Sequence, residues 1–249
     1  MDLGIEGKRA VVAASTSGLG LGTAMALGEA GCTVVVNGRT EERVNATAEK
    51  VSNAVPVVAD ISTRQGASAF IDAATEALGG GIDILVTNGG GPPPGNFSET
   101  DIDAYDAALE MNLIAMATMA KAVVPGMQAQ SWGRIVAITS TSVHTPIPNL
   151  ILSNTARSGL TSFLKTTALE VVGDGITINT AQPGLHLTPR LADIYGDDGV
   201  EELAASQPMG QLGDPGDFGK AVAFLCSEQA NYITGVSLPI DGGRFTQMQ

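Results

Sequence analysis

Short hydrophobic runs alternate with longer stretches of helical length along almost the whole chain. The runs are five or six residues long, rich in Val and Ile, and bounded by turn-forming residues, which is typical of buried strands in a parallel sheet. The strands that we expect are 9–14, 33–37, 55–59, 83–87, 134–139, 176–181 and 236–240. Strands that alternate with helices predict an α/β fold in which helices cover both faces of a seven-stranded parallel sheet.

Two connections are longer than the loops usual in such a fold. The segment 88–100 is rich in glycine and proline, which favours an extended, exposed path. The segment 185–213 is interpreted as a substrate lid loop, because open α/β sheets bind ligands beyond the carboxyl ends of their strands. Its acidic side chains between Asp193 and Glu202 are interpreted as a solvated helix face. The pattern has no break, so we expect residues 1–249 to form a single domain.

The chain of 249 residues is acidic, with a net charge of −13 and a pI near 4.4. This charge argues against nucleic acid, anionic membrane surfaces and acidic carrier proteins as partners. Cys32 and Cys226 have no spacing typical of a disulfide framework or a metal site, so we expect buried free thiols and no metal. The N-terminal segment lacks a signal-peptide pattern, and no apolar run approaches the length of a membrane span. Both observations favour a cytoplasmic protein.

A glycine-rich segment, ASTSGLGLG at 14–22, joins the first expected strand to the first expected helix. Gly18, Gly20 and Gly22 allow the backbone to approach a phosphate closely, and the helix N-terminus offers free N–H groups and a partial positive charge. A glycine cluster in this position predicts the nucleotide site of a Rossmann-type, doubly wound fold.

With this segment the chain resembles the classical short-chain dehydrogenase/reductase family, and the resemblance extends over nearly the whole chain. The family's Thr-Gly-x-x-x-Gly-x-Gly loop falls on residues 13–20, where Ala13 and Ala14 replace its first two residues. The resemblance implies a nicotinamide nucleotide bound by Ala14, Ser15, Thr16, Ser17, Gly18, Leu19, Gly20, Asn37, Arg39, Asp60, Ile61, Asn88, Gly89, Gly90, Pro183, Gly184 and Thr188. For Asp60 and for residues 88–90, the alternative interpretation is that they are simple turn residues without a role in binding.

The end of the second expected strand, VVVNGRT, bears on the choice between NAD and NADP. An acidic residue there would accept hydrogen bonds from the adenosine ribose and repel a 2′-phosphate. This chain has Gly38 and Arg39 instead, so we expect NADP(H) to be preferred, with NAD(H) as the alternative. The competing interpretation of Arg39 is an ordinary surface charge.

In this family a serine, a tyrosine and a lysine act at the substrate, and an asparagine helps to organise the proton path. The resemblance places the asparagine at Asn112 and the serine at Ser140, whereas Ser153 and Arg157 occupy the tyrosine and lysine positions. The i, i+4 spacing predicts that Ser153 and Arg157 share one helix face. A serine hydroxyl is a much poorer acid than a phenol of pKa about 10, and arginine stays protonated. Tyrosine-dependent hydride transfer therefore does not carry over unchanged.

Both histidines of the chain fall on loops after strands that we expect to border the same pocket. An imidazole with a pKa of about 6.5 exchanges protons near neutral pH, so His144 and His186 are candidate acids or bases, with His144 ahead. The alternative for each is a structural or solvated histidine. Tyr195 lies in the expected lid and is interpreted as a packing residue.

Three functions stay open on the sequence. The first is an NAD(P)-dependent oxidoreductase that acts on a small carbonyl or alcohol with a non-standard acid or base. The second is a catalytically silent subunit that binds nucleotide or an active paralogue, and the third is lyase or isomerase chemistry in the same pocket. The missing tyrosine and lysine, with the acidity of the chain, argue against reduction of oxoacyl groups on a carrier protein. The C-terminal match, ITGVSLPIDGG, implies a homotetramer or homodimer.

Overall fold

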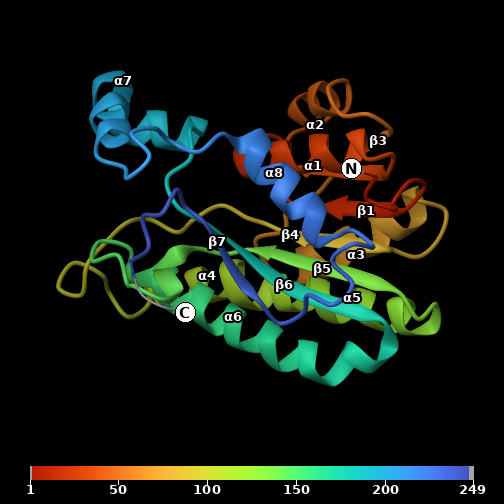
Figure 1. Cartoon of the computed structure of the whole chain (residues 1–249). Coiled ribbons are helices and arrows are strands. Elements are labelled where there is room, and N and C mark those ends of the chain that lie inside the picture. Colours follow the sequence, from red (N-terminus) through yellow and green to blue (C-terminus); the bar gives the residue numbers. More distant parts are fainter. Residues whose placement is uncertain (1, 247–249) are drawn as a thin grey trace.

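A computed structural model describes residues 2–246, and its centre is one seven-stranded sheet (Figure 1). All seven expected strands are confirmed, and all pair in parallel in the order β3-β2-β1-β4-β5-β6-β7. The strands are β1 (Arg9–Val12), β2 (Thr33–Gly38), β3 (Ala54–Val58), β4 (Ile84–Thr87), β5 (Gly133–Ile138), β6 (Ile176–Pro183) and β7 (Ser237–Ile240).

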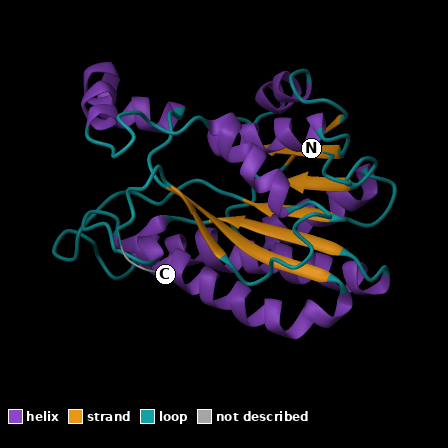
Figure 2. Ribbon diagram, viewed as in Figure 1, coloured by secondary structure: helices purple, strands orange, loops and turns teal. Residues whose placement is uncertain are grey.

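Helices cover both faces of this sheet, as Figure 2 shows. One hydrophobic core lies under α1, α2 and α8, and a second lies under α3, α5 and α6. The helical elements are α1 (Gly18–Glu29), α2 (Glu41–Ala48), α3 (Arg64–Ala77), α4 (Ala104–Leu109), the π-helical turn η1 (Glu110–Ile114), α5 (Ala115–Ala129), η2 (Thr141–Val143), α6 (Ile151–Val171), η3 (Val172–Asp174), α7 (Pro189–Ala205) and α8 (Pro215–Leu225). The predicted Rossmann-type, doubly wound fold is therefore confirmed.

The uninterrupted hydrophobic character of the strands follows from this two-sided burial. In β1, Ala10 and Val12 belong to the core under α1 and α8, whereas Val11 belongs to the core under α3 and α5. Successive side chains of a strand point to opposite faces, so a strand covered on both faces needs apolar residues at every position.

The order of the strands also fixes where a ligand can bind. β1 lies within the sheet, with β2 on one side and β4 on the other. The connection after β1 therefore runs toward one end of the sheet, and the connection after β4 runs toward the other end. The loops that follow β1 and β4 separate at this point and leave a crevice at the carboxyl edge of the sheet, which is where doubly wound folds bind ligands.

The segment 185–213, predicted as a lid loop, contains a helix over most of its length. In α7 the backbone departs from helical geometry at Gly196, whose φ of 65° lies in the left-handed region that glycine tolerates. Figure 1 shows α7 apart from both helical layers. Asp193 and Glu202 are exposed on it, as the interpretation of a solvated helix face requires.

The prediction that no apolar stretch approaches the length of a membrane span is wrong. The continuous helical segment Ala104–Ala129 has 26 residues and contains an 18-residue stretch with a mean hydropathy of 1.4. Its apolar side chains have another place, because Met119, Val123 and Met127 of α5 lie buried in the core beside α3 and α6. This helix is therefore packed against the core through its buried side chains.

The two cysteines are buried and free, as predicted. Both lie in the core under α1 and α8. Burial raises the pKa of Cys32 to about 12 and also raises the pKa of Cys226. These thiols are therefore protonated at neutral pH and are poor nucleophiles.

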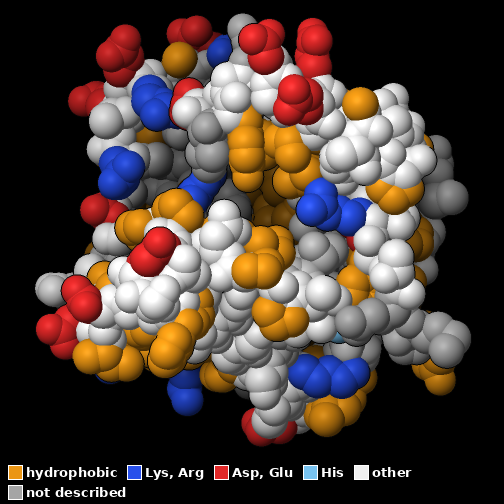
Figure 3. Space-filling view, turned by 90° about the vertical axis from the view of Figure 1, so that its left-hand side faces the viewer, with side chains coloured by type: hydrophobic (Ala, Val, Ile, Leu, Met, Phe, Trp, Pro, Cys, Tyr) orange, Lys and Arg blue, Asp and Glu red, His pale blue; other side chains and the backbone are white. Residues whose placement is uncertain are grey.

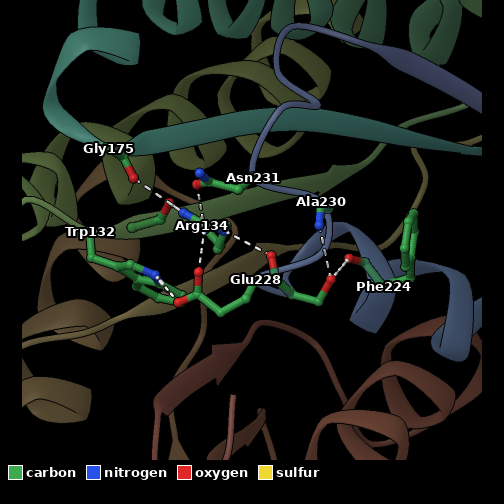
Figure 4. A network of polar contacts seen from close by, with 9 residues as sticks. Trp132, Arg134, Gly175, Phe224, Glu228, Ala230 and Asn231 are labelled. Atoms are coloured by element: carbon green, nitrogen blue, oxygen red, sulfur yellow. Dashed lines mark hydrogen bonds and ion pairs between the residues drawn. The ribbon is translucent and has the colours of Figure 1, made fainter. Parts of the chain in front are cut away.

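The opposite, amino edge of the sheet is held by Arg134 at the start of β5. This side chain is fully buried, and its guanidinium stacks over the ring of Trp132, with 4.4 Å from Cζ to the ring centroid (Figure 4). Glu228 accepts a hydrogen bond from Trp132 and lies 3.8 Å from the guanidinium. Arg134 donates hydrogen bonds to the carbonyl groups of Gly133, Gly175 and Ser227 and to the Asn231 side chain. Burial lowers the pKa of Arg134, so these acceptors stabilise a charge that has little access to water.

Candidate nucleotide and active site

The glycine-rich loop lies between β1 and α1 at the crevice described above. Ser17 is the N-cap of α1 but makes no side-chain capping bond, so the N–H groups of the first turn remain available to an anion. A Cβ atom at Gly20 would lie 2.5 Å from the carbonyl oxygen of Ala14, so only glycine fits there. Gly18 has a φ of 55° and faces Thr188 across the loop. The loop therefore has the shape and the donors that a phosphate group requires.

Ala14 is held in an unusual conformation at the position of the family's first glycine. Its φ is 46°, in the left-handed region where an alanine is strained. Its N–H group donates to Asn37 Oδ1 at 3.0 Å, and its carbonyl accepts from Asn88 Nδ2 at 3.1 Å. The loop keeps the glycine-like backbone although the glycine is absent, and two asparagines fix it.

Two residues predicted to bind the cofactor lie behind the loop instead. Ser15 is fully buried, and its hydroxyl donates to the Val12 carbonyl and accepts from the Asn37 N–H group. The buried Asn37 amide donates to the carbonyl groups of Val57 and Ala59. Direct contact of these two side chains with a nucleotide does not fit this arrangement. They brace the loop against β3.

At the end of β2 the chain has Gly38 and Arg39 and no acidic side chain. A Cβ atom at Gly38 would meet the methyl group of Thr16 at 2.5 Å, so a longer side chain is excluded there. The next residue, Arg39, is exposed. Asp60 accepts a hydrogen bond from the Ser62 N–H group, which lowers the pKa of this carboxyl, and the charge of Arg39 lowers it further. Arg39 and Asp60 therefore border the same part of the site.

The remaining predicted cofactor residues lie along the crevice. Ile61 is buried in the core, so its side chain does not line the site. A Cβ atom at Gly184 would lie 2.7 Å from Cβ of Asp241, so this position needs glycine, whereas one at Gly89 would meet only the flexible end of the Met116 side chain. Pro183 ends β6 beside Gly184, and Thr188 is the N-cap of α7 without a side-chain capping bond.

The π-helical turn η1 positions Asn112. This turn places the buried amide so that Nδ2 donates to the Gly90 carbonyl at 2.9 Å. Its Oδ1 atom is also buried and has no partner among the described residues. A buried acceptor without a partner is costly, and π-helical turns are frequent at functional sites. Asn112 is therefore poised to accept a hydrogen bond from a ligand or a water molecule.

The pair in the tyrosine and lysine positions shares one face of α6, as its spacing predicts. Arg157 Nε donates to Ser153 Oγ at 3.2 Å, and Arg157 Nη1 donates to the Ile138 carbonyl at 2.9 Å. Burial lowers the pKa of Arg157 to about 10, and the nearby charge of Arg190 contributes in the same direction. Arg157 thus stays protonated at neutral pH and acts as a fixed charge. Ser140 caps η2 by accepting from the Ser142 N–H group.

The two histidines do not share surroundings, contrary to the prediction that they border one pocket. His144 is exposed, packs at 5.1 Å from the ring of Phe245, and lines a cavity of about 590 Å³ between η2, α6 and the segment before β7. His186 is buried against Phe218 of α8, in the other helical layer, and burial lowers its pKa. Loops from neighbouring strands can leave the sheet toward opposite faces, which sequence position does not reveal.

One basic residue at this edge was not among the predicted site residues. Arg190, in the first turn of α7, donates from Nη1 to the Gly91 carbonyl at 3.1 Å and from Nη2 to the Pro92 carbonyl at 3.4 Å. The available signal was a basic residue at the start of an otherwise acidic lid. Figure 3 shows that the face bearing α7 is hollowed, with hydrophobic side chains inside the hollow and basic side chains beside it.

Known proteins resemble this chain over nearly all of its length. The sequence model of a family described as "Enoyl-(Acyl carrier protein) reductase" matches residues 13–244. Dehydrogenase/reductase SDR family member 4 of Sus scrofa is 32% identical over 98% of this chain and 89% of its own length. The 3-oxoacyl-[acyl-carrier-protein] reductase FabG of Aquifex aeolicus is 32% identical over 98% of this chain and 100% of its own length.

Solved structures extend this likeness to three dimensions. L-sorbose reductase from Gluconobacter frateurii, complexed with NADPH and L-sorbose, superposes with a TM-score of 0.92 at 30% identity and covers 100% of both chains. A 7α-hydroxysteroid dehydrogenase complexed with NADH superposes with a TM-score of 0.90 at 27% identity and covers 100% of this chain and 98% of its own. With this fold, this glycine-rich loop and these relatives, the chain belongs to the short-chain dehydrogenase/reductase family, whose members are NAD(P)-dependent oxidoreductases.

Proposed function

We propose that this chain is an NADP(H)-preferring oxidoreductase that interconverts a small carbonyl compound and its alcohol. The observation that carries the proposal is the preserved nucleotide site: the uncapped N-terminus of α1 lies at the crevice, and Gly20 has no room for a side chain. A bound nicotinamide nucleotide would supply or accept the hydride at this edge of the sheet. These features support a working cofactor site in spite of the changed catalytic pair.

Preference for NADP(H) is supported by the end of β2. Arg39 is exposed beside Gly38, and the Thr16 methyl group fills the space that an acidic side chain would need. An arginine can form charge-assisted hydrogen bonds to a phosphate, whereas an acid would repel it. The two solved relatives hold NADPH and NADH respectively, so the preference of this chain rests on its own residues.

With Ser153 and Arg157 at the tyrosine and lysine positions, we propose different catalytic roles for these two side chains. Arg157 carries a fixed positive charge, which would stabilise the negative charge that develops on the oxygen of a carbonyl during hydride transfer. The Ser153 hydroxyl accepts from Arg157 and is free to donate to the same oxygen. Neither side chain is suited to release a proton at neutral pH. We propose that His144, at the end of the turn capped by Ser140, or water in contact with it, supplies the proton.

The test is turnover by the purified homomeric protein. Absorbance of the reduced nicotinamide reports the reaction with a panel of ketones, aldehydes and alcohols, in each direction and with each nucleotide. Turnover with NADPH is expected. Nucleotide binding without turnover across the whole panel would contradict the proposal.

The proton donor has its own prediction. His144→Ala is expected to lower kcat about 100-fold or more, because general acid catalysis contributes ~10²–10⁴-fold, while NADPH affinity stays the same. His186→Asn serves as the matched control, since His186 packs against Phe218 and does not line the cavity beside His144. Steady-state kinetics of both variants decide the matter, and full activity in His144→Ala excludes the role.

A second candidate is a catalytically silent subunit. The observation in its favour is that Ser153 and Arg157 satisfy each other, with Nε donating to Oγ at 3.2 Å. Such a subunit would bind nucleotide or an active paralogue and would show turnover only in a mixed assembly. Activity of the purified homomer separates the two candidates.

Reduction of acyl groups on a carrier protein is not proposed, although the relative from Aquifex aeolicus bears that name. The tyrosine and lysine positions hold Ser153 and Arg157, and the net charge of −13 disfavours an acidic carrier.

A further inference from the structure

The geometry points to an anion-binding pair formed by Arg157 and Arg190, and we propose that the substrate carries a carboxylate or phosphate group near its reacting carbon. This inference rests on the proposed function, because it concerns the substrate of the same site. It assigns a role to Arg190 in choosing the substrate.

The Arg157 guanidinium has N–H groups that donate to no acceptor among the described residues. Its bonds to Ser153 and to the Ile138 carbonyl use Nε and Nη1, and both acceptors are uncharged. Among the described residues, no acceptor is within hydrogen-bond distance of Nη2, and no carboxylate lies within 4.0 Å of the guanidinium. A guanidinium presents donors in a planar fork that matches a carboxylate or phosphate. The free side of Arg157 therefore suits an anion.

Arg190 comes from a different element, the first turn of α7. It holds the carbonyl groups of Gly91 and Pro92, in the loop after β4, and these acceptors are uncharged as well. The preceding residue of that loop, Gly90, accepts from Asn112. Arg190 is thus tied to the same loop as Asn112, within the expected catalytic region.

Arg157 and Arg190 reach the expected catalytic region from two elements, since Arg157 lies on α6 beside Ser153 and Arg190 binds Gly91, next to the Gly90 carbonyl that accepts from Asn112. The charge of Arg190 is one of the causes that lower the pKa of Arg157, and no described acidic group offsets it there. The chain has 26 acidic and 13 basic residues, so acids to neutralise these arginines are abundant in the composition. Two like charges gathered in a partly buried place are stabilised when an anion binds between them.

The nucleotide could also provide an anion, through its diphosphate. The uncapped N-terminus of α1 already offers backbone donors for that group. Arg157 lies elsewhere, beside Ser153 and the end of β5, where the reacting atoms are expected. We therefore assign the pair to the substrate, which makes small oxo acids, hydroxy acids or phosphorylated ketoses the expected class.

Calorimetric titrations of the full chain saturated with NADP⁺ test this assignment. The probes are matched pairs of an anion and its neutral counterpart: pyruvate and pyruvamide, levulinate and levulinamide, dihydroxyacetone phosphate and dihydroxyacetone. At least one anion should bind 10-fold or more tightly than its neutral partner, which corresponds to about 1.4 kcal/mol. Arg190→Gln should remove most of that preference. Lys50→Gln, which removes an exposed charge just before β3 at the opposite edge, should leave the preference unchanged.

The following results would overturn the assignment of this arginine pair to a substrate anion. Equal affinity within every pair, or the same preference in Arg190→Gln as in the unaltered chain, contradicts an anion site at this pair. Weaker NADP⁺ binding in Arg190→Gln with the preference retained assigns Arg190 to the diphosphate instead. Arg157→Gln adds a second measurement, which should show the same loss if the variant keeps its NADP⁺ affinity. If the unaltered chain binds NADP⁺ and reduces neutral ketones, the proposed function stands even when the anion site fails.

Discussion

At the scale of single residues, the nucleotide loop keeps its shape although its sequence has changed. Ala14 has a φ of 46°, which costs an L-amino acid with a Cβ atom roughly 1–2 kcal/mol. Asn37 and Asn88 hold this conformation through the N–H and carbonyl groups of Ala14. The strain of one residue is thus offset by hydrogen bonds from two others, and the phosphate-binding backbone survives.

The strain at Ala14 leads to a stability prediction. Ala14→Gly is expected to stabilise the chain by up to about 1 kcal/mol, because relief of the left-handed strain exceeds the added entropy of the unfolded chain. Urea unfolding measures the change. Ala13→Gly is the matched control, since Ala13 is fully buried and outside the positive-φ positions, and it should destabilise. A loss of stability in Ala14→Gly would show that the strain is not significant.

Arg39 decides the choice of nucleotide in our proposal. Arg39→Gln is expected to weaken NADPH binding about 10- to 100-fold, the size of a lost charge-assisted contact, and to leave NADH binding unchanged. Arg43→Gln is the control, because Arg43 is also exposed and is the third residue of α2. Calorimetric titration with both nucleotides gives the affinities. Tighter binding of NADH than of NADPH to the unaltered chain contradicts the preference.

At the scale of elements, the two edges of the sheet have different tasks. The carboxyl edge carries the loops of the candidate site, whereas the amino edge is fixed by the buried network around Arg134 (Figure 4). That network joins β5 to Gly175 before β6 and to Ser227 and Asn231 after α8. A firmly held amino edge keeps β5 and β6 in register, and with them Ile138 and Pro183 beside the site.

Removal of this network should destabilise the fold without a direct effect on the site. Arg134→Met is expected to lower the free energy of unfolding by about 3 kcal/mol, because several buried acceptors lose their donor. Lys8→Met is the control, since Lys8 stacks on the same Trp132 ring from a less buried place and should cost about 0.5–1 kcal/mol. Urea unfolding compares the two. Equal stability of Arg134→Met and the unaltered chain would contradict the role of this network.

At the scale of the whole molecule, charge is distributed unevenly. The exposed acids of α7 contribute to a net charge of −13, while Arg157 and Arg190 lie without described carboxylate partners at the crevice. A local cationic site in an acidic protein attracts anions only over a short range, because salt screens longer distances. We therefore expect this site to attract a small anionic substrate more strongly than an acidic protein partner, which the net negative charge of the whole chain repels.

We also propose that the chain assembles into a homodimer or homotetramer. Leu169 and Val172, at the end of α6 and the start of η3, are 70% and 50% exposed in the single chain, which is an unfavourable state for apolar residues. Light scattering of the purified protein should give the mass of a dimer or tetramer. Leu169→Glu should shift the mass toward that of a monomer, whereas Glu170→Gln, beside it, should not. A monomeric mass at micromolar concentration contradicts the proposal.

Much of this molecule was determined by local sequence alone. The hydrophobic runs predicted all seven strands, and the glycine-rich segment predicted the loop before α1, because strand burial and helix N-termini have short-range signatures. The spacing of Ser153 and Arg157 likewise predicted their shared helix face, which the hydrogen bond of 3.2 Å between Arg157 Nε and Ser153 Oγ confirms. The predicted roles of these residues in catalysis stay predictions.

Only the tertiary structure decided which side chains turn toward the crevice. Ser15 and Asn37 turn inward, the two histidines have different surroundings, and Arg190, on a helix predicted as a lid loop, donates to carbonyl groups of the loop after β4. These outcomes depend on how loops leave a twisted sheet and on which distant groups satisfy each buried donor. The loops are brought together by strand register and helix packing, which are long-range properties that no short stretch of sequence encodes.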